Sequence, residues 1–495
     1  MKKVFLILTI GLLSFVHVRA RERCVKNLNS LIELISEPNP SLCICTPIDL
    51  KGMELQLPVG KTIHIKKGKL FNGTLIGNNT KIVVDSTSCL GVVMKGVWHS
   101  PTIDDRWFDD NYLDDNEMMS NINHLQSNEV NNSIHIFRNY EVNIDSVSHY
   151  AFVLSSNTSF HIHSTIRIKP NNYAKYGIID ISNKEKVTVE GGVLIGDVGK
   201  HNYIPNSTSE WGMGYNVVAS CNISISNSKV MLCTGDGIYL GGYKEQNFSI
   251  FDNACRDICI ENVTCDKNCR QGLSIVHAKD VIIKKCHFTN TGQVEFINPG
   301  HGIDIEPNIS HNRNMSVSDV SITGCEFYGN MGKDISTAHY ICSNTGGNIR
   351  NIKITESKLA DEITIRSGSF IIDSIEVSKI SVYLSINDLG DIEINNSEIR
   401  GGLYLHSSVA SEEHPDYTGK LENLVLTNCL FTNLESNKGK YILALSGDMK
   451  RIKKLIFNDC EFVDYGFRLV NQKFINPRQL YACTFNNCNF HSRFK

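Results

Sequence analysis

A nine-residue pattern recurs along most of the chain and constrains its fold more than any other feature. A copy usually begins with Asn or Asp, has apolar residues at its second, fourth and ninth positions, and has a polar or turn residue at its sixth. Clear copies run from Asn222 to Val230, from Asp257 to Cys265 and from Asp280 to Phe288. The alternation is that of a β-strand, and one short strand cannot bury its own apolar face. The copies must therefore stack, which predicts an all-β solenoid with parallel coils ~4.8 Å apart.

Like residues at one position of the pattern predict ladders that run through the stack. Position six is often Asn, as in Asn227 and Asn262, which suits a hydrogen-bonded turn. Position nine is often Phe, as in Phe288, and position seven is often Cys, as in Cys286. The chain has 17 cysteines, enough for a disulfide framework. We interpret those at position seven instead as small buried hydrophobic residues.

A second strand follows many copies, beginning at a glycine such as Gly237, Gly272 or Gly302. Because no change in composition divides residues 140–495, this region is predicted to be one continuous β-helix. Residues 21–139 have a different pattern, with a short helix expected near residues 114–122. The end of a solenoid needs a cover, so residues 21–139 are expected to form an N-terminal cap and the first strands.

The N-terminus has the pattern of an export signal. Lys2 and Lys3 precede an apolar stretch, and Val18-Arg19-Ala20 is a plausible cleavage site. Residues 1–20 are therefore predicted to be a signal peptide, and the mature protein is expected to be secreted or periplasmic. No later segment has the ~18 apolar residues that a membrane span needs. The net charge of −3 and the pI of about 6.6 disfavour nucleic acid as a partner.

Polar residues gather between residues 196 and 308, beside successive second strands. Strand parity directs Ile303 and Ile305 inward, and Asp304 and Glu306 outward. The two carboxylates are therefore expected on one exposed face, ~6.5 to 7 Å apart along the strand. An exposed acid pair is costly because the charges repel each other, which favours a functional interpretation of the pair.

Two columns of side chains are expected to cross neighbouring coils of this face. One column should hold Asp304, Ser274 and Tyr239. The other lies just before the recurrent glycine and should hold Asp236, Gln271 and His301. Such columns would place polar groups from different repeats within reach of one substrate.

This face has the groups that hydrolysis of a glycosidic bond requires, a proton donor and a base or nucleophile. We assign Asp304 or Glu306 as the donor and Asp236 or Glu210 as the base. The candidate substrate-binding residues are Trp211, Tyr239, Arg270, Gln271, His201 and His301. Each of these side chains also has a structural interpretation, as a turn residue, a loop clamp or a member of an ion pair. The cysteine spacing is not that of a zinc site, so we assign no metal ligand.

These segments resemble secreted right-handed parallel β-helix proteins of the pectate-lyase-like superfamily. The strongest segments of the resemblance are Glu210-Trp-Gly-Met-Gly214, Gly235-Asp-Gly-Ile-Tyr-Leu240, Arg270-Gln-Gly-Leu-Ser274 and Gly302-Ile-Asp-Ile-Glu-Pro-Asn308. Gly235-Asp236-Gly237 and Gly300-His301-Gly302-Ile303 are distantly similar to segments of polygalacturonases. The resemblance implies a single-stranded, right-handed parallel β-helix that acts on a polysaccharide. Lyases of this superfamily use calcium and an arginine base, a role that Arg270 fits by residue type.

Three hypotheses follow for the function. The first is a secreted carbohydrate-active enzyme that cleaves a polysaccharide, one containing uronate, by hydrolysis without a cofactor. The second is a polysaccharide lyase or a uronate epimerase on the same face, with calcium as a candidate cofactor in the lyase. The third is a non-catalytic glycan-binding or adhesin-like surface protein.

Overall fold

The computed structural model describes residues 23–37, 41–144, 149–204, 209–242, 253–307, 315–337, 348–384, 388–407, 419–432, 442–447, 449–463 and 483–491. The chain divides into two compact units, Met1–Trp98 and His99–Lys495. The predicted signal peptide, residues 1–20, lies outside the described residues. Among the described residues, no helix is both long and apolar enough to cross a membrane.

The first unit contains one helix and a seven-stranded sheet whose register-resolved pairs are all parallel. Its elements are β1 (Arg23–Val25), α1 (Leu28–Ser36), β2 (Ser41–Ile44), β3 (Pro47–Asp49), β4 (Glu54–Gln56), β5 (Thr62–Ile65), β6 (Lys69–Val84) and β7 (Cys89–His99). Helix α1 begins with a capping box, in which Asn27 and Ser30 bond each other's backbone. This region was predicted as part of an N-terminal cap, and that role stays a prediction.

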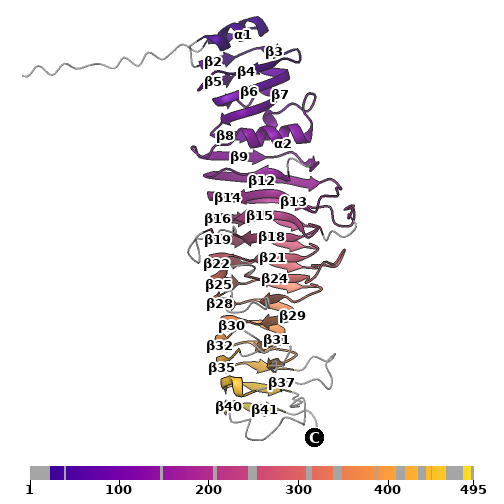
Figure 1. The fold of residues 1–495 in the computed structure, drawn as a ribbon, viewed down its shortest axis with the longest axis vertical. Coiled ribbons are helices and arrows are strands. Elements are labelled where there is room, and N and C mark those ends of the chain that lie inside the picture. The colour runs from indigo at the N-terminus through magenta and orange to yellow at the C-terminus, as the bar shows by residue number, and fades with distance from the viewer. Residues whose placement is uncertain are drawn as a thin grey trace, which may run out of the picture. The chain divides into compact units, whose positions relative to one another are not determined.

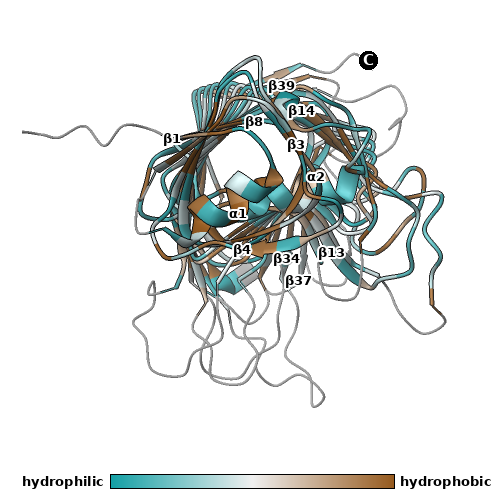
Figure 2. Ribbon diagram, turned by 90° about the horizontal axis from the view of Figure 1, so that it is seen from above, coloured by the Kyte–Doolittle hydropathy of each residue, from teal (hydrophilic) through white to brown (hydrophobic). Residues whose placement is uncertain are grey.

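The second unit is a parallel β-helix, in which each coil contributes strands to three walls (Figures 1 and 2). The repeat wall consists of β8 (Thr102–Asp104), β9 (Asn132–Ile136), β12 (Thr158–Ile168), β14 (Glu185–Ile195), β16 (Cys221–Ser226), β19 (Cys255–Glu261), β22 (Ala278–Lys284), β25 (Ser316–Thr323), β28 (Asn348–Thr355), β30 (Gly368–Asp373), β32 (Leu389–Asn395), β35 (Leu421–Thr427), β38 (Ile452–Asn458) and β40 (Cys483–Asn486). The corner wall consists of β10 (Tyr140–Val142), β17 (Lys229–Met231), β20 (Thr264–Asp266), β23 (His287–Thr289), β26 (Glu326–Tyr328), β33 (Glu398–Ile399), β36 (Leu430–Phe431), β39 (Glu461–Val463) and β41 (Asn489–His491), with parts of β12, β14, β29 and β31. The polar wall consists of β11 (Tyr150–Val153), β13 (Lys175–Ser182), β15 (Trp211–Val218), β18 (Asp236–Gly241), β21 (Gln271–Ile275), β24 (His301–Ile305), β27 (Ile335–Thr337), β29 (Lys358–Ile365), β31 (Glu376–Leu384), β34 (Leu403–Ser407) and β37 (Leu443–Gly447).

Short helices accompany the first and last coils of this unit. They are the 3-10 helices at Asp105–Trp107 and Met449–Arg451 and the helix α2 (Asp115–His124). The helix α2 was predicted near residues 114–122 and is confirmed there, with Asp114 as its N-cap. The strands β8 and β9 lie in residues 21–139, which were predicted to form the cap and the first strands, and they pair within the sheet of the β-helix.

The nine-residue pattern corresponds to one repeat-wall strand and the corner-wall strand that follows it. Position six has a left-handed backbone, with φ of 55° at Asn227 and 53° at Asn262. Asn tolerates this conformation better than most residues, which explains its recurrence there. The side chains form the predicted ladder, since Asn262 Nδ2 donates to Asn227 Oδ1 at 2.8 Å and Asn428 donates to Asn396 at 2.8 Å.

The interior of the coils is filled by the apolar positions of the pattern. Phe288 stacks on Phe327 with ring centroids 5.2 Å apart, as predicted for position nine. Cys286 and Cys325 are buried, and the described cysteines are all free thiols. Of the five position-seven cysteines, Cys286, Cys325, Cys429 and Cys460 are core residues as predicted, whereas Cys488 is half-buried. The stacked cores make each wall a rigid support on which outward side chains repeat coil by coil.

Candidate active site on the polar wall

The polar wall brings both predicted columns into register. One column consists of Asp236, Gln271 and His301, and the other of Tyr239, Ser274 and Asp304. The glycine that follows the first column is needed for the close stacking of the coils. A Cβ at Gly272 would lie 2.5 Å from the carbonyl oxygen of Gly302, closer than real contacts allow. The glycines thus hold successive polar side chains one coil apart.

Arg270 lies at the centre of a cluster of carboxylates. Its Nη1 donates to both oxygens of Asp236 at 3.3 Å, its Nη2 donates to Glu306 at 3.2 Å, and its Nε lies 3.8 Å from Glu210. The Arg270 side chain is 18% exposed, and that of Asp236 is fully buried. Arg270 was predicted to bind substrate, but in this structure its guanidinium is already engaged by the protein's own acids.

Asp304 differs from its prediction as an exposed acid, because it is only 3% exposed. Its side chain lies against the preceding coil, where Gln271 Nε2 donates to Asp304 Oδ2 at 2.8 Å. Asp304 Oδ1 has no hydrogen-bond partner among the described residues. Burial, together with the nearby charge of Glu306, raises the pKa of Asp304 to about 8. Asp304 is therefore mainly a neutral carboxylic acid at pH 7.

Asp236 and Arg270 influence each other's protonation. Burial raises the pKa of Asp236 to about 6, and the Arg270 charge opposes this rise. Burial works against the charged form of Arg270, but Asp236 and Glu306 more than compensate and raise its pKa. A lyase base must be in its neutral form before it can take a proton from the substrate. The acids around Arg270 stabilise its charged form, so Arg270 is poorly suited to that role.

Two aromatic side chains lie beside the carboxylates. Trp211 begins β15 and is 45% exposed, and its ring meets that of Tyr239 edge-on with centroids 6.2 Å apart. Glu210 immediately precedes Trp211, and its side chain is 34% exposed. The structure therefore brings Glu210, Trp211, Tyr239, Asp236, Arg270, Gln271, Asp304 and Glu306 together.

His201 does not reach the open face. Its Nδ1 lies 2.8 Å from Asp197 Oδ2, its Nε2 lies 3.2 Å from Ser209 Oγ, and its side chain is fully buried. Asp197 also accepts a hydrogen bond from Tyr176 at 2.7 Å. The group closes a loop beside β13, a tertiary contact that residue types alone do not reveal.

His301 stands at the end of its column and is held by the backbone. The N–H of Lys333 donates to His301 Nδ1 at 2.7 Å, which leaves the proton of the neutral ring on Nε2. Burial and the neighbouring charges of Arg366 and Lys333 lower the pKa of His301 to about 3. His301 is thus a neutral side chain at pH 7.

The polar wall continues beyond the region singled out in the sequence. The side chain of Glu362, in β29, is 3% exposed and pairs with Lys333 and Lys379, and the Nζ of Lys379 lies 3.1 Å from Glu362 Oε2. Arg366 follows at the end of the same strand. The alternation of Glu362-Ile-Thr-Ile-Arg366 was a usable signal, but no glycine marks this strand, and the residues were missed.

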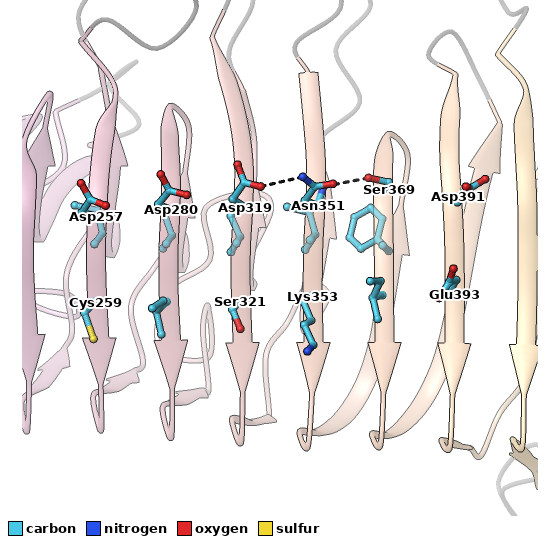
Figure 3. Close-up of a pocket in the computed structure, with 17 residues that line it drawn as sticks. Asp257, Cys259, Asp280, Asp319, Ser321, Asn351, Lys353, Ser369, Asp391 and Glu393 are labelled. Carbon is cyan, nitrogen blue, oxygen red and sulfur yellow. Dashed lines mark hydrogen bonds between the residues drawn. The ribbon is translucent and has the colours of Figure 1, made fainter.

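A separate groove of about 800 Å³ lies on the repeat wall, over β19 to β32 (Figure 3). Figure 3 shows one row of acids and amides along it, including Asp257, Asp280 and Asp319. Asn351 donates to Asp319 Oδ1 at 2.9 Å, so part of this row is the position-one ladder of the repeat. The residues predicted as catalytic do not line this groove.

Among the described residues, no group of three or more His, Cys, Asp or Glu side chains is arranged to hold a metal ion. The carboxylates around Arg270 are paired with its guanidinium, whose positive charge stands where a metal ion would otherwise be needed to balance them. Whether calcium takes part stays a prediction attached to the lyase hypothesis.

No family model matches the chain. It is similar to two proteins of Bacillus subtilis strain 168. One is the SPbeta prophage-derived uncharacterized protein YorA, with 25% identity over 48% of this chain and 42% of that protein. The other is the uncharacterized protein YclG, with 28% identity over 33% of this chain and 30% of that protein. The chain thus spans less than half of either relative.

Solved structures of similar fold include three with low sequence identity. The Azotobacter vinelandii mannuronan C-5 epimerase AlgE4 A-module has a TM-score of 0.46 and 11% identity, covering 74% of this chain and 90% of that one. An exopolygalacturonase from Thermotoga maritima has a TM-score of 0.46 and 11% identity, covering 79% of this chain and 91% of that one. The Streptococcus pneumoniae surface adhesin PfbA has a TM-score of 0.35 and 13% identity, covering 83% and 89%.

Proposed function

We propose that the polar wall hydrolyses a glycosidic bond of a polysaccharide, with Asp304 as the proton donor. The observation that carries the proposal is the state of Asp304. Asp304 is buried, one of its oxygens has no partner among the described residues, and burial with the charge of Glu306 raises its pKa to about 8, which favours the protonated form at neutral pH. Buried polar atoms are nearly always hydrogen-bonded, so an unpaired one in a polar cluster suits contact with a substrate.

The second carboxylate of the mechanism is assigned to Glu210. Of the two candidates for the base, Asp236 is fully buried against Arg270, whereas the Glu210 side chain is 34% exposed and open to water. A base that activates water must be reachable by water, which favours Glu210. Glu306, paired with Arg270, supplies the charge that helps to keep Asp304 protonated.

The remaining residues support binding of an extended substrate. Trp211 offers an exposed ring face for a sugar beside Glu210, and Tyr239 supports it from the next coil. Outward side chains repeat at the ~4.8 Å spacing of the coils, which suits a linear polymer. Asp304 is 3% exposed, and its charged neighbours are Glu306 and Arg270.

Export of the mature protein is part of this proposal, since an enzyme that cleaves a polysaccharide acts where the polymer is, outside the cytoplasm. The support is the basic and apolar N-terminal pattern. Sequencing the N-terminus of protein recovered from the culture medium or periplasm tests it.

The experiment is a screen of purified protein against acidic and neutral polysaccharides, reading new reducing ends and ultraviolet absorbance together. Reducing ends without absorbance are expected. Asp304→Asn should lower the rate by about 10² to 10⁴-fold, as loss of a general acid does. Asp319→Asn on the repeat wall is the matched control and should be as active as the wild type.

Two outcomes would contradict the hydrolase. Absorbance rising with the reducing ends establishes a lyase. The raised pKa of Arg270 makes that residue an unfavourable base for the reaction. Saturable binding of a glycan that stays intact establishes the non-catalytic alternative. Full activity in both Asp304→Asn and Glu306→Gln removes the assignment of the acid.

A further inference from the structure

The column that contains Asp304 continues over the next coils of the polar wall. Asp304 lies beside Ser336 of β27, Ser336 beside Thr364 of β29, and Thr364 beside Ser381 of β31. Small hydroxyl side chains therefore follow the acid for three coils.

Arg366 lies two coils from Asp304 and two residues further along the strand. That is a backbone separation of roughly 12 Å, for ~4.8 Å per coil and ~3.3 Å per residue. Its Nη1 donates to Ser336 Oγ and to the carbonyl of Thr337, both at 3.1 Å. Its own N–H donates to Thr337 Oγ1 at 2.7 Å. The guanidinium is half-buried and held in one orientation by neutral groups.

Arg366 has no carboxylate partner among the described residues. This distinguishes it from Arg270, Lys333 and Lys379, each of which is paired with a buried or half-buried acid of the same wall. A fixed guanidinium presents a fork that matches a carboxylate or sulfate. Within the part of the chain that the structure describes, the hydrogen bonds of the guanidinium come from Nη1, which leaves Nε and Nη2 for an anion.

Aromatic rings continue from Arg366 along the same face. The guanidinium carbon of Arg366 lies 5.2 Å from the ring centroid of Tyr383, and Tyr383 meets the ring of His406 at 5.7 Å. In the neighbouring column Lys379 Nζ lies 4.6 Å from the centroid of Tyr404. Such a pair can recognise an acidic sugar, because the cation binds the anionic group and the half-exposed aromatic face packs against the ring that carries it.

We propose that Arg366 and Tyr383 form a subsite for an acidic sugar unit, whose carboxylate or sulfate binds the Arg366 guanidinium. The subsite lies on the C-terminal side of Asp304, so it rests on the proposed function for its place relative to cleavage. It does not rest on cleavage for binding. It also gives the substrate of the polar wall a class, a polysaccharide with acidic units, and moves the anion-binding role from Arg270 to Arg366.

The test is calorimetric titration of three oligosaccharide probes of equal length into full-length Asp304→Asn, which avoids loss of ligand by cleavage. The probes are an oligouronate, its carboxyl-reduced neutral counterpart and a sulfated oligosaccharide. An acidic probe is expected to bind more tightly than the neutral one, with an affinity that falls as salt is added. The two acidic probes distinguish a carboxylate from a sulfate as the ligand.

Adding Arg366→Gln is expected to weaken the acidic probe about tenfold or more and to leave the neutral probe unchanged, as loss of a charge-assisted hydrogen bond does. Arg366→Lys keeps the charge without the fork and should lie between the two. Arg256→Gln, an exposed arginine on the repeat wall, is the matched control and should bind as its parent does.

Three results would overturn the subsite. They are unchanged affinity for the acidic probe in Arg366→Gln, equal weakening of the neutral probe, and no binding of either acidic probe. If Arg366→Gln does not fold, Arg366→Lys decides the question by the same comparison. The two proposals fail separately. If Asp304→Asn still cleaves the polysaccharide but binds the acidic probe through Arg366 in a salt-sensitive way, only the catalytic assignment is removed. If Asp304→Asn no longer cleaves but its affinity for the acidic probe does not depend on Arg366, only the subsite is removed.

Discussion

Asp304 shows how one residue acquires a property that its type does not carry. An isolated buried carboxylate is costly, so the group takes up a proton instead of remaining charged. Gln271 satisfies one oxygen, and Glu306 adds a like charge that works in the same direction as burial. The positive charge of Arg270 offsets the repulsion between the neighbouring carboxylates, so several acids can lie close together.

The raised pKa of Asp304 predicts a stability that falls as pH rises. Folded Asp304, with a pKa of about 8, holds a proton that the unfolded chain has already lost above about pH 4. Between pH 6.5 and 7.5 this gives a slope of at most ~1.4 kcal/mol per pH unit. Asp304→Asn should remove that slope, as measured by urea unfolding at several pH values.

Other buried acids also titrate near this window, so the informative quantity is the difference between wild type and Asp304→Asn. Asp236, with a pKa of about 6, contributes in the same direction at the lower edge of the window. The pKa of His301 is lowered to about 3, so this residue destabilises the fold progressively as pH falls through the unfolded value of about 6.5, in the direction opposite to Asp304. Asp319, whose pKa is held below its usual value by Asn351, is ionised in both states, and Asp319→Asn is the control. Parallel profiles for wild type and Asp304→Asn would contradict the assignment.

At the scale of elements, each coil depends on tight turns between its walls. The turn from the repeat wall to the corner wall passes through a left-handed residue at position six, and its side chain bonds to the next coil. Position six therefore combines a backbone demand with a ladder contact. The two contributions can be separated because glycine adopts the left-handed backbone readily but has no side chain to form the ladder hydrogen bond.

Asn262 is the position at which to separate them. Asn262→Gly should lower the free energy of unfolding by about 0.5 to 1.5 kcal/mol, the value of the amide hydrogen bond to Asn227. Asn262→Ala should lose a further ~1 to 2 kcal/mol, because a Cβ is strained at φ of 53°. Chemical denaturation measures both variants, and an alanine variant as stable as the glycine variant would contradict the turn argument.

The same elements show how far the sequence leads. The pattern predicts the stacking, the ladders and both columns of the polar wall, because period and register are local properties of a repeat. It does not predict that Asp304 is buried, because that depends on Gln271 reaching across from another coil. It does not predict Arg366, because β29 runs through the corner without the glycine that marks other second strands.

At the scale of the whole molecule, the β-helix unit is a one-dimensional stack. Each coil contacts the coils next to it, so the unit lacks the single central core of a globular domain. The stacked Phe288 and Phe327 illustrate this, since they join the coils of β23 and β26. A site spread over several coils then depends on the local integrity of the stack.

Phe327→Ala tests this architecture. Phe327 is 2% exposed, and its truncation leaves a cavity that should cost ~3 to 5 kcal/mol. Because coils interact with their neighbours, hydrogen exchange should rise most in peptides containing β23, β26 and the start of β29, and the increase should fade toward β38. Phe490→Ala in β41, where the ring is 43% exposed, should have a small and terminal effect. Uniform loss of protection across the unit in Phe327→Ala would mean that the stack unfolds as one cooperative body, and that the site cannot loosen coil by coil.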